Sequence, residues 1–289
     1  TVRSEWDSLV ADEGGNSALL NRATQGLYPP GSTFKILTAM EYMRENPSFD
    51  KYRYECSGSD TFGGNVIRCY NGEQHGTVDL KSSLAHSCNG SFAHIGVGLN
   101  RKSYRKLCEA FGFNSSLGVK FVSSRSRFVL DEKSDTAEAA QTAIGQGKTT
   151  ITPLQNALIS ATIANDGVMM TPYLVDHTES VDGHVVKKYE PQEKRTVISR
   201  KRANQVTRMM RSVVSDGTAA ALRNLSYPVA GKTGTAEIDS EGTSHAWFVG
   251  FAPAADPKIA VSVIVEGAGT GSQYAVPIAA KMLEEYLGN

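Results

Sequence analysis

The sequence predicts an α+β fold, in which a mainly helical lobe accompanies an antiparallel sheet. Apolar residues recur at helical spacing through much of residues 32–222, and the last quarter then contains three successive strand-like segments. An amphipathic segment follows the third of them and closes the chain. Helices first, then strands with short connections, then a covering helix are typical of α+β architecture, whereas a parallel sheet would alternate helices with strands.

The predicted helices follow an irregular lead-in. Residues 1–31 have no sustained period and end in the chain breaker Pro29-Pro30-Gly31. Residues 46–76 are rich in Gly, Ser, Asn and Asp, which predicts a loop or a short hairpin. Gly217 is expected to break the last helix. The segments with helical spacing of apolar residues are 32–44, 80–87, 92–99, 104–111, 137–144, 154–165 and 201–222.

The strands are predicted mainly near the carboxyl end. Residues 173–189 are expected to form a two-stranded ribbon that turns at Asp182-Gly183. Three successive strands of one sheet are then expected, followed by an amphipathic helix at 274–287. The three strands are predicted at 229–237, 246–251 and 258–266.

Composition argues against several classes of function. The chain has 289 residues, of which 40% are hydrophobic, so it is long enough for one or two domains with a sizeable core. Thirty basic residues balance thirty acidic ones, which argues against nucleic acid and against polybasic attachment to a membrane surface. No apolar run approaches the roughly 20 residues of a membrane-spanning helix, and the first residues do not resemble a signal peptide.

The chain has four cysteines, which are too few for a fold built on disulfides. They are Cys56, Cys69, Cys88 and Cys108. No C-x-x-C pair is present, so we expect no structural zinc site, no other metal and no cofactor. Cys56 and Cys69 lie 13 positions apart in a loop-like stretch. A disulfide between them would stabilise the fold by about 3 kcal/mol, and two separate thiols are the alternative.

The pattern S-x-x-K occurs three times, and context separates the three copies. The copy at Ser48 lies in an irregular segment. The copy at Ser103 lies in a strongly basic stretch, which is expected to form a solvent-exposed helix face. The copy at Ser32 opens a predicted helix directly after a rigid turn, so Lys35 lies on the same helix face as the serine. Apolar neighbours of Lys35 favour its partial burial.

These two residue types have a joint chemical use. A serine hydroxyl becomes a good nucleophile when a neighbouring base takes its proton. Burial lowers the pKa of a lysine, so Lys35 is able to act as that base near neutral pH. The free N–H groups at a helix start also suit a developing oxyanion. The alternative is that Ser32 only caps the helix, which on this segment alone is the simpler interpretation.

Two further motifs favour catalysis over capping. Ser87-Cys88-Asn89 is the chain's one S-x-N sequence, and Lys232-Thr233-Gly234 is its one K-[ST]-G sequence. Serine β-lactamases and penicillin-binding proteins carry S-x-x-K, a second S-x-N element and K-T-G in this order. Each motif is also predicted where that chemistry requires it: at a helix start, at a helix end and on a strand.

The chain therefore resembles the penicillin-binding transpeptidases, and the similarity extends beyond the three motifs. Residues 20–35 resemble the monofunctional, class B branch, and residues 145–155 resemble the segment between the second and third motifs. Residues 232–237 and 246–253 are similar to the paired strands of that family. The resemblance implies a fold of the β-lactamase and transpeptidase type for residues 1–289, with residues 1–19 as an irregular lead-in.

The resemblance also implies roles in catalysis. Ser32 would attack the carbonyl between two terminal D-alanines of a peptidoglycan stem peptide and form an acyl-enzyme. Lys35 would accept the serine proton, and Ser87 would relay a proton to the departing amine. Lys232 would keep the local potential positive. Asn89 would bind the substrate amide and orient the first lysine.

Substrate binding is implied for the third motif. Thr233 and Thr235 would bind the terminal carboxylate, and the backbone N–H groups of Ser32 and Thr235 would form the oxyanion hole. Gly234 and Ala236 leave little side-chain bulk on that strand, so an extended peptide is able to lie along it. An amine of a second stem peptide would take the acyl group, and β-lactam antibiotics would trap Ser32.

The family pattern sets further expectations for the whole protein. Its members usually have two strands, another domain and a membrane anchor before the region that matches Leu20. We therefore expect this chain to be a fragment that holds only the last three strands of a five-stranded sheet. The implied location is the extracytoplasmic face of the bacterial plasma membrane, with glycosyltransferase, divisome or elongasome partners and no nucleic acid.

Three related functions remain as alternatives. A D,D-carboxypeptidase differs in using water as the acceptor, and a β-lactam sensor is acylated without turnover. A class A β-lactamase is less expected, because it needs a glutamate in an E-x-x-L-N segment, which this sequence lacks.

Overall fold

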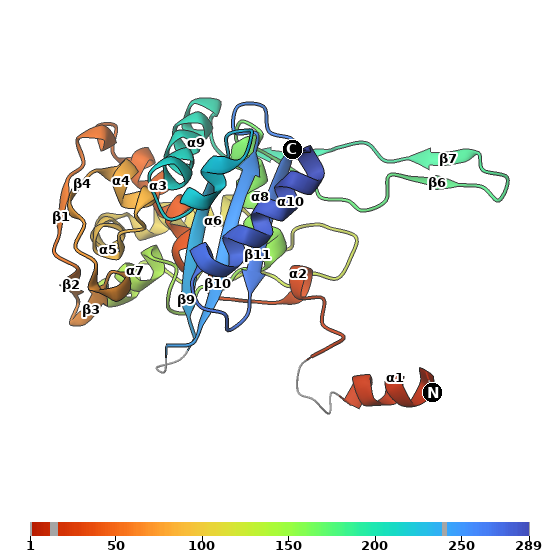
Figure 1. Ribbon diagram of the computed structural model, residues 1–289, viewed down its shortest axis with the longest axis horizontal. Helices are drawn as coiled ribbons and strands as arrows, with labels where there is room; N and C mark the ends of the chain where they lie inside the picture. The colour runs from red at the N-terminus through yellow and green to blue at the C-terminus, as the bar shows by residue number, and fades with distance from the viewer. Residues whose placement is uncertain (1, 12–16, 239–241, 289) are drawn as a thin grey trace.

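The computed structural model describes residues 2–11, 17–238 and 242–288, and it confirms the α+β prediction. A three-stranded antiparallel sheet lies beside a lobe of helices, with a long helix across its front in Figure 1. One continuous core of buried apolar side chains joins the sheet to the helical lobe.

The sheet matches the three strands expected near the carboxyl end. Its strands are β9 (Ala230–Glu237), β10 (Ser244–Ala252) and β11 (Ile259–Val265), in the order β11-β10-β9. The central strand β10 is almost wholly buried, and it contacts both α8 (Pro153–Ala164) and α10 (Val276–Leu287). A strand buried on both faces needs cover on both sides, so the sheet is enclosed between helices.

The helical lobe follows the predicted segments closely. Side-chain caps begin most of these helices, as the Thr152 hydroxyl does for α8 by accepting from the N–H of Gln155. The 3₁₀ turn η1 spans Gly31–Phe34, and a π-helical turn at Gly271–Ala275 precedes α10. The remaining helices are α3 (Lys35–Glu45), α4 (Leu80–Ala85), α5 (Asn89–Gly98), α6 (Arg101–Ala110), α7 (Thr136–Ala143) and α9 (Arg200–Ser215), with short 3₁₀ turns at Phe49–Lys51, Tyr70–Gly72 and Ala220–Asn224.

Four short strand pairs lie outside the main sheet in the described part of the chain. The segment predicted as a loop or hairpin contains the hairpin β2 (Ser59–Phe62) and β3 (Asn65–Arg68), and also β1 (Tyr54–Cys56), which pairs with β4 (Gly76–Val78) at the end of that segment. The ribbon expected at 173–189 is also confirmed and projects far from the body in Figure 1. Its strands are β6 (His177–Glu179) and β7 (Val185–Lys188), and a further pair joins β5 (Val168–Met170) to β8 (Glu193–Thr196).

The prediction of an irregular lead-in was wrong for part of residues 1–31. Helix α1 spans Val2–Ala11 and lies apart from the body in Figure 1, and helix α2 spans Arg22–Gln25. Four residues are too few to show a hydrophobic period, which explains the missed α2. The side chains of residues 5–11 in α1 are exposed and likewise give no core-facing stripe. Residues 12–16 lie outside the described part. No described helix combines the length and apolar character needed to cross a membrane.

Candidate active site

Ser32 directly follows Gly31, at a turn whose backbone geometry requires glycine. Gly31 has a φ of 53°, and a Cβ atom there would lie 2.7 Å from the carbonyl oxygen of Thr235. The N–H of Gly31 donates to the carbonyl of Gly145 at 2.9 Å. The turn thus passes directly against strand β9. The Ser32 side chain forms no cap of η1 or α3, so the capping alternative is not supported.

The residues that follow Ser32 anchor the turn in the core. The Phe34 ring is buried and packs against three aromatic rings, those of Tyr104, Phe113 and Phe128, with ring centroids 5.8–6.1 Å apart. The Thr33 hydroxyl donates to the Pro30 carbonyl at 2.8 Å. These contacts hold the start of helix α3 against the sheet, and they therefore fix where Ser32 and Lys35 lie.

Lys35 is fully buried, which goes further than the partial burial expected from its apolar neighbours. Its amine donates to the Ser87 carbonyl at 2.7 Å and to the Asn89 Oδ1 at 2.6 Å, and its Nζ lies 3.2 Å from the Ser87 hydroxyl oxygen. Burial lowers the pKa of Lys35 to about 8. All three bonds go to the second motif, so the first two motifs form one hydrogen-bonded unit.

The second motif lies in the connection between α4 and α5. Ser87 has a φ of 57°, in the left-handed region that residues other than glycine rarely adopt. Asp79 caps α4 by accepting from the Ser82 N–H, and the Asn89 amide donates to the Arg68 carbonyl at 2.7 Å. The Ser87 carbonyl and hydroxyl both face Lys35 as a result of this geometry.

The third motif lies on β9, as predicted. Lys232 is fully buried, and its amine donates to the Thr233 carbonyl at 2.9 Å. Burial, followed by the nearby charge of Lys35, holds the pKa of Lys232 well below its usual range. A Cβ on Gly234 would lie 3.0 Å from the Trp247 side chain, so the motif needs its glycine for close packing.

One cavity of about 660 Å³ joins the three motifs. The predicted site residues that line it are Ser32, Ser87, Asn89, Thr233, Gly234 and Thr235. The two buried lysines contact residues of this lining, since Lys35 donates to Ser87 and Asn89 and Lys232 donates to Thr233. The structure thus brings together all the site residues that the sequence predicted.

The other two S-x-x-K copies have no comparable setting. Lys51 and Lys106 are exposed, and neither Ser48 nor Ser103 lines the cavity. Burial of the lysine therefore separates the first copy from these two, as the sequence context predicted.

Several cavity residues were missed by the sequence analysis. The Thr218 hydroxyl hydrogen-bonds the Thr233 hydroxyl and also lines the cavity. The position of Thr218 next to the helix-breaking Gly217 was the only available signal. Thr270 and Gly271 line the cavity too, at the start of the π-helical turn that precedes α10.

Comparison with known proteins finds the family that the three motifs resemble, and the match extends over nearly the whole chain. The family model described as the penicillin binding protein transpeptidase domain matches residues 6–284. Peptidoglycan D,D-transpeptidase PbpA of Mycolicibacterium smegmatis is 34% identical over 297 residues, which cover 94% of this chain and 57% of that protein. This chain thus spans about half the length of the curated relatives it matches.

Solved structures agree with the sequence comparison. The D,D-transpeptidase domain of a peptidoglycan glycosyltransferase from Eggerthella lenta has a TM-score of 0.89 at 28% identity, covering 98% of this chain and 72% of that one. Penicillin-binding protein A from M. tuberculosis, as its penicillin G acyl-enzyme complex, has a TM-score of 0.88 at 31% identity, covering 98% and 66%. The chain belongs to the penicillin-binding protein transpeptidase domain family.

Proposed function

We propose that this chain is the catalytic domain of a peptidoglycan D,D-transpeptidase. The Ser32 oxygen forms an ester with the carbonyl carbon between the two terminal D-alanines, and the C–N bond to the last D-alanine breaks. An amine of a second stem peptide then displaces Ser32 and forms the cross-link. The observation that carries the proposal is the meeting of Ser32, Ser87 and Asn89 with strand β9 around one cavity.

Proton transfer is assigned to the buried amines. A lysine with a pKa of about 8 is partly neutral near neutral pH, so Lys35 is able to take the Ser32 proton. Ser87 passes a proton to the leaving D-alanine amine, since its hydroxyl lies beside the Lys35 amine. Lys232 keeps the local potential positive, and the two lysines together favour one positive charge over two.

Substrate recognition is assigned to the cavity wall. Thr233 and Thr235 bind the terminal carboxylate, Asn89 binds the peptide amide, and the substrate lies along β9 beside Gly234. The backbone N–H groups of Ser32 and Thr235 form the oxyanion hole, which the close approach of Gly31 to Thr235 supports. β-Lactams react with Ser32 in the same way, as they do in the related penicillin-binding protein A.

The cellular setting follows from the same proposal. Stem peptides are found in the cell wall, so the domain acts on the extracytoplasmic face of the plasma membrane. Its partners are a glycosyltransferase that supplies new glycan strands and the membrane proteins of the division or elongation machinery.

Mass spectrometry after exposure to penicillin tests the proposal. We expect one penicilloyl adduct per chain, on the peptide that contains Ser32, and none in Ser32→Ala. The matched control is Ser48→Ala, which removes the serine of another S-x-x-K copy and is expected to keep the adduct. An adduct that persists in Ser32→Ala would overturn the assignment.

Product analysis separates the related activities. With a donor stem peptide and an acceptor amine, a transpeptidase releases D-alanine and forms the cross-linked dimer. Release without a dimer indicates a carboxypeptidase, and stable acylation by penicillin without D-alanine release indicates a sensor. Rapid hydrolysis of the penicilloyl ester would indicate a β-lactamase.

A further inference from the structure

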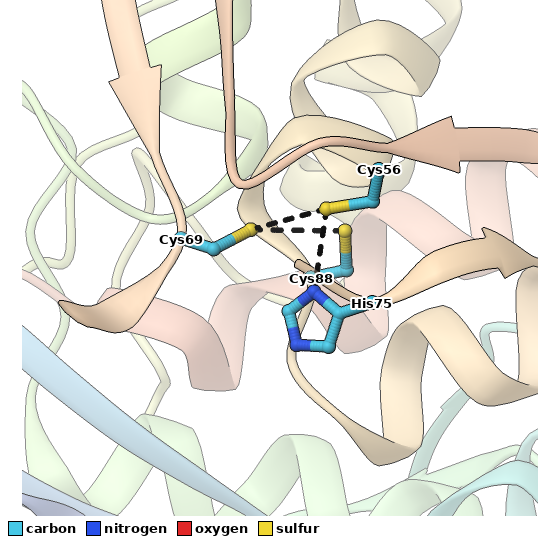
Figure 2. A group of neighbouring side chains, drawn as sticks. All are labelled: Cys56, Cys69, His75 and Cys88. Carbon is cyan, nitrogen blue, oxygen red and sulfur yellow. Dashed lines mark hydrogen bonds between the residues drawn. The ribbon is translucent and has the colours of Figure 1, made fainter. Parts of the chain in front are cut away.

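A second cluster of reactive side chains lies behind the second motif. It consists of Cys56, Cys69, His75 and Cys88, each of which points one sulfur or nitrogen atom toward a common centre (Figure 2). These four atoms all lie within 4.8 Å of one another. The cysteines are free thiols rather than partners in a disulfide. We infer that this cluster, which we call the Cys₃His site, binds a zinc ion with tetrahedral geometry.

The distances within the cluster fit zinc. The Sγ atom of Cys69 lies 3.7 Å from that of Cys56 and 3.8 Å from that of Cys88. A tetrahedron with Zn–S bonds of about 2.3 Å has S···S edges of about 3.8 Å. The Nδ1 atom of His75 lies 3.3 Å from the Cys56 sulfur, close to the edge of about 3.6 Å expected between a sulfur and a nitrogen ligand. The atoms are thus already spaced as ligands.

The histidine is oriented as a metal ligand. Its Nδ1 faces the three sulfurs, and its Nε2 is buried without a hydrogen-bond partner among the described residues. The Glu73 carboxylate lies 3.6 Å from that Nε2. Metal-binding histidines usually turn their second nitrogen toward a carboxylate in this way, which fixes the ring and strengthens the ligand. Glu73 therefore serves as the orienting partner of His75.

The protein environment suits a thiolate-bound cation. All three cysteines are at most 3% exposed, and the His75 side chain is 5% exposed. Cys88 stands at the start of the ten-residue helix α5, and its sulfur accepts from the N–H of Ser91 at 3.4 Å. The positive end of a helix stabilises negative sulfur. A Zn²⁺ ion with three thiolates and one imidazole carries one negative charge, which this helix end offsets.

The choice of metal follows from the ligand types. Three thiolates and an imidazole in a tetrahedral arrangement favour Zn²⁺ over the oxygen-preferring Mg²⁺ and Ca²⁺. Four protein ligands fill the tetrahedron and leave no position for a reacting water. The site is therefore structural rather than catalytic.

The proposed ion would stabilise the active site directly. Cys88 is the middle residue of the S-x-N motif, between the two residues that bond to Lys35. Cys69 directly follows Arg68, whose carbonyl accepts from the Asn89 amide. A zinc ion would tie the connection between α4 and α5 to strand β1 and to the segment after β3. It would thereby hold Ser87 in its left-handed conformation.

The spacing of the four ligands in the sequence gives no indication of this site. The four ligands are 13, 6 and 13 positions apart, with none of the close pairs that mark most zinc motifs. We therefore expected no zinc from the sequence. The antiparallel pairing of β1 with β4 brings Cys56 opposite Gly76, next to His75, and this pairing assembles half of the site.

Metal analysis tests the inference without relying on activity. We expect about one zinc ion per chain when the protein is purified under reducing conditions without a chelator. Cys56→Ser and His75→Gln are expected to retain less than about a tenth of that zinc. The matched control is Cys108→Ala, which removes the one cysteine outside the Cys₃His site and is expected to retain all of it.

Two measurements on the unmodified chain keep the test decisive if a variant does not fold. Cobalt(II) added to metal-free protein is expected to give the intense visible bands of tetrahedral thiolate coordination. Chelation is expected to lower the melting temperature by about 10 °C, and zinc is expected to restore it. Retention of no metal, absence of cobalt bands, or a mass about 2 Da lower from a disulfide between Cys56 and Cys69 would each overturn the inference. Penicillin acylation of Ser32 reports separately on the proposed function.

Discussion

The pH dependence of acylation is the most direct test of Lys35 as the general base. Its pKa of about 8 means that about 1% of the amines are neutral at pH 6, about 9% at pH 7 and about half at pH 8. A solvated lysine with a pKa of 10.5 would be only about 0.03% neutral at pH 7. Burial thus raises the neutral fraction about 300-fold at that pH.

The sign of the effect follows from which form reacts. Only the neutral amine accepts the Ser32 proton, so acylation speeds up as pH rises. We expect the second-order rate constant to rise about ninefold from pH 6 to 7 and about fivefold from pH 7 to 8. It should level off above pH 9. Because Lys232 is buried close by, the midpoint belongs to the two coupled lysines rather than to one alone.

Stopped-flow fluorescence with a labelled penicillin measures this rate constant directly. Lys106→Met is the matched control, because it removes an exposed lysine of another S-x-x-K copy and should leave the profile unchanged. Lys35→Arg keeps the charge at every pH and should acylate slowly with no rise. A flat profile for the unmodified chain between pH 6 and 9 would refute Lys35 as the base.

Three substitutions test the scaffold around the site. In Gly145→Ala, the new Cβ would lie 1.9 Å from the Gly31 carbonyl oxygen, so we expect a loss of more than about 2 kcal/mol in stability and about 100-fold slower acylation. Trp247→Phe removes a 3.0 Å bond from the indole N–H to the Pro29 carbonyl and should cost about 1–3 kcal/mol in urea denaturation at an unchanged m-value. Asp79→Ala removes the cap of α4 and should cost about 1 kcal/mol, measured by thermal unfolding. An unchanged stability in any of the three would show that the contact in question contributes nothing.

Local sequence signals were sufficient for most of the fold. Helix α8 carries a threonine cap and a proline in its first turn, and its bounds agree with the prediction to within one residue. The three strands of the sheet were predicted as successive strand-like segments with short connections. The ribbon was found from Asp182-Gly183, a dipeptide that favours a tight turn. Each of these signals acts over a few residues, which is why one sequence reveals it.

Features that depend on distant residues could not be predicted. Thr218 meets Thr233 because α9 packs against strand β9, and the neighbouring Gly217 indicates only the end of a helix, not that contact. The convergence of Cys56 and His75 depends on the pairing of two three-residue strands. Strands so short have too few residues to show an alternating pattern, so their register appears only in three dimensions.

The active site contains several structural features that are each unfavourable for folding. Lys35 and Lys232 are buried amines, and Ser87 adopts a left-handed backbone that costs about 1 kcal/mol or more. Such features persist only where the surroundings hold them in place. Phe34 in its aromatic cluster holds the first motif, the almost wholly buried β10 holds the third, and the Cys₃His site lies directly behind the second. The second motif, which has the strained backbone, is thus the one that gains most from a bound ion.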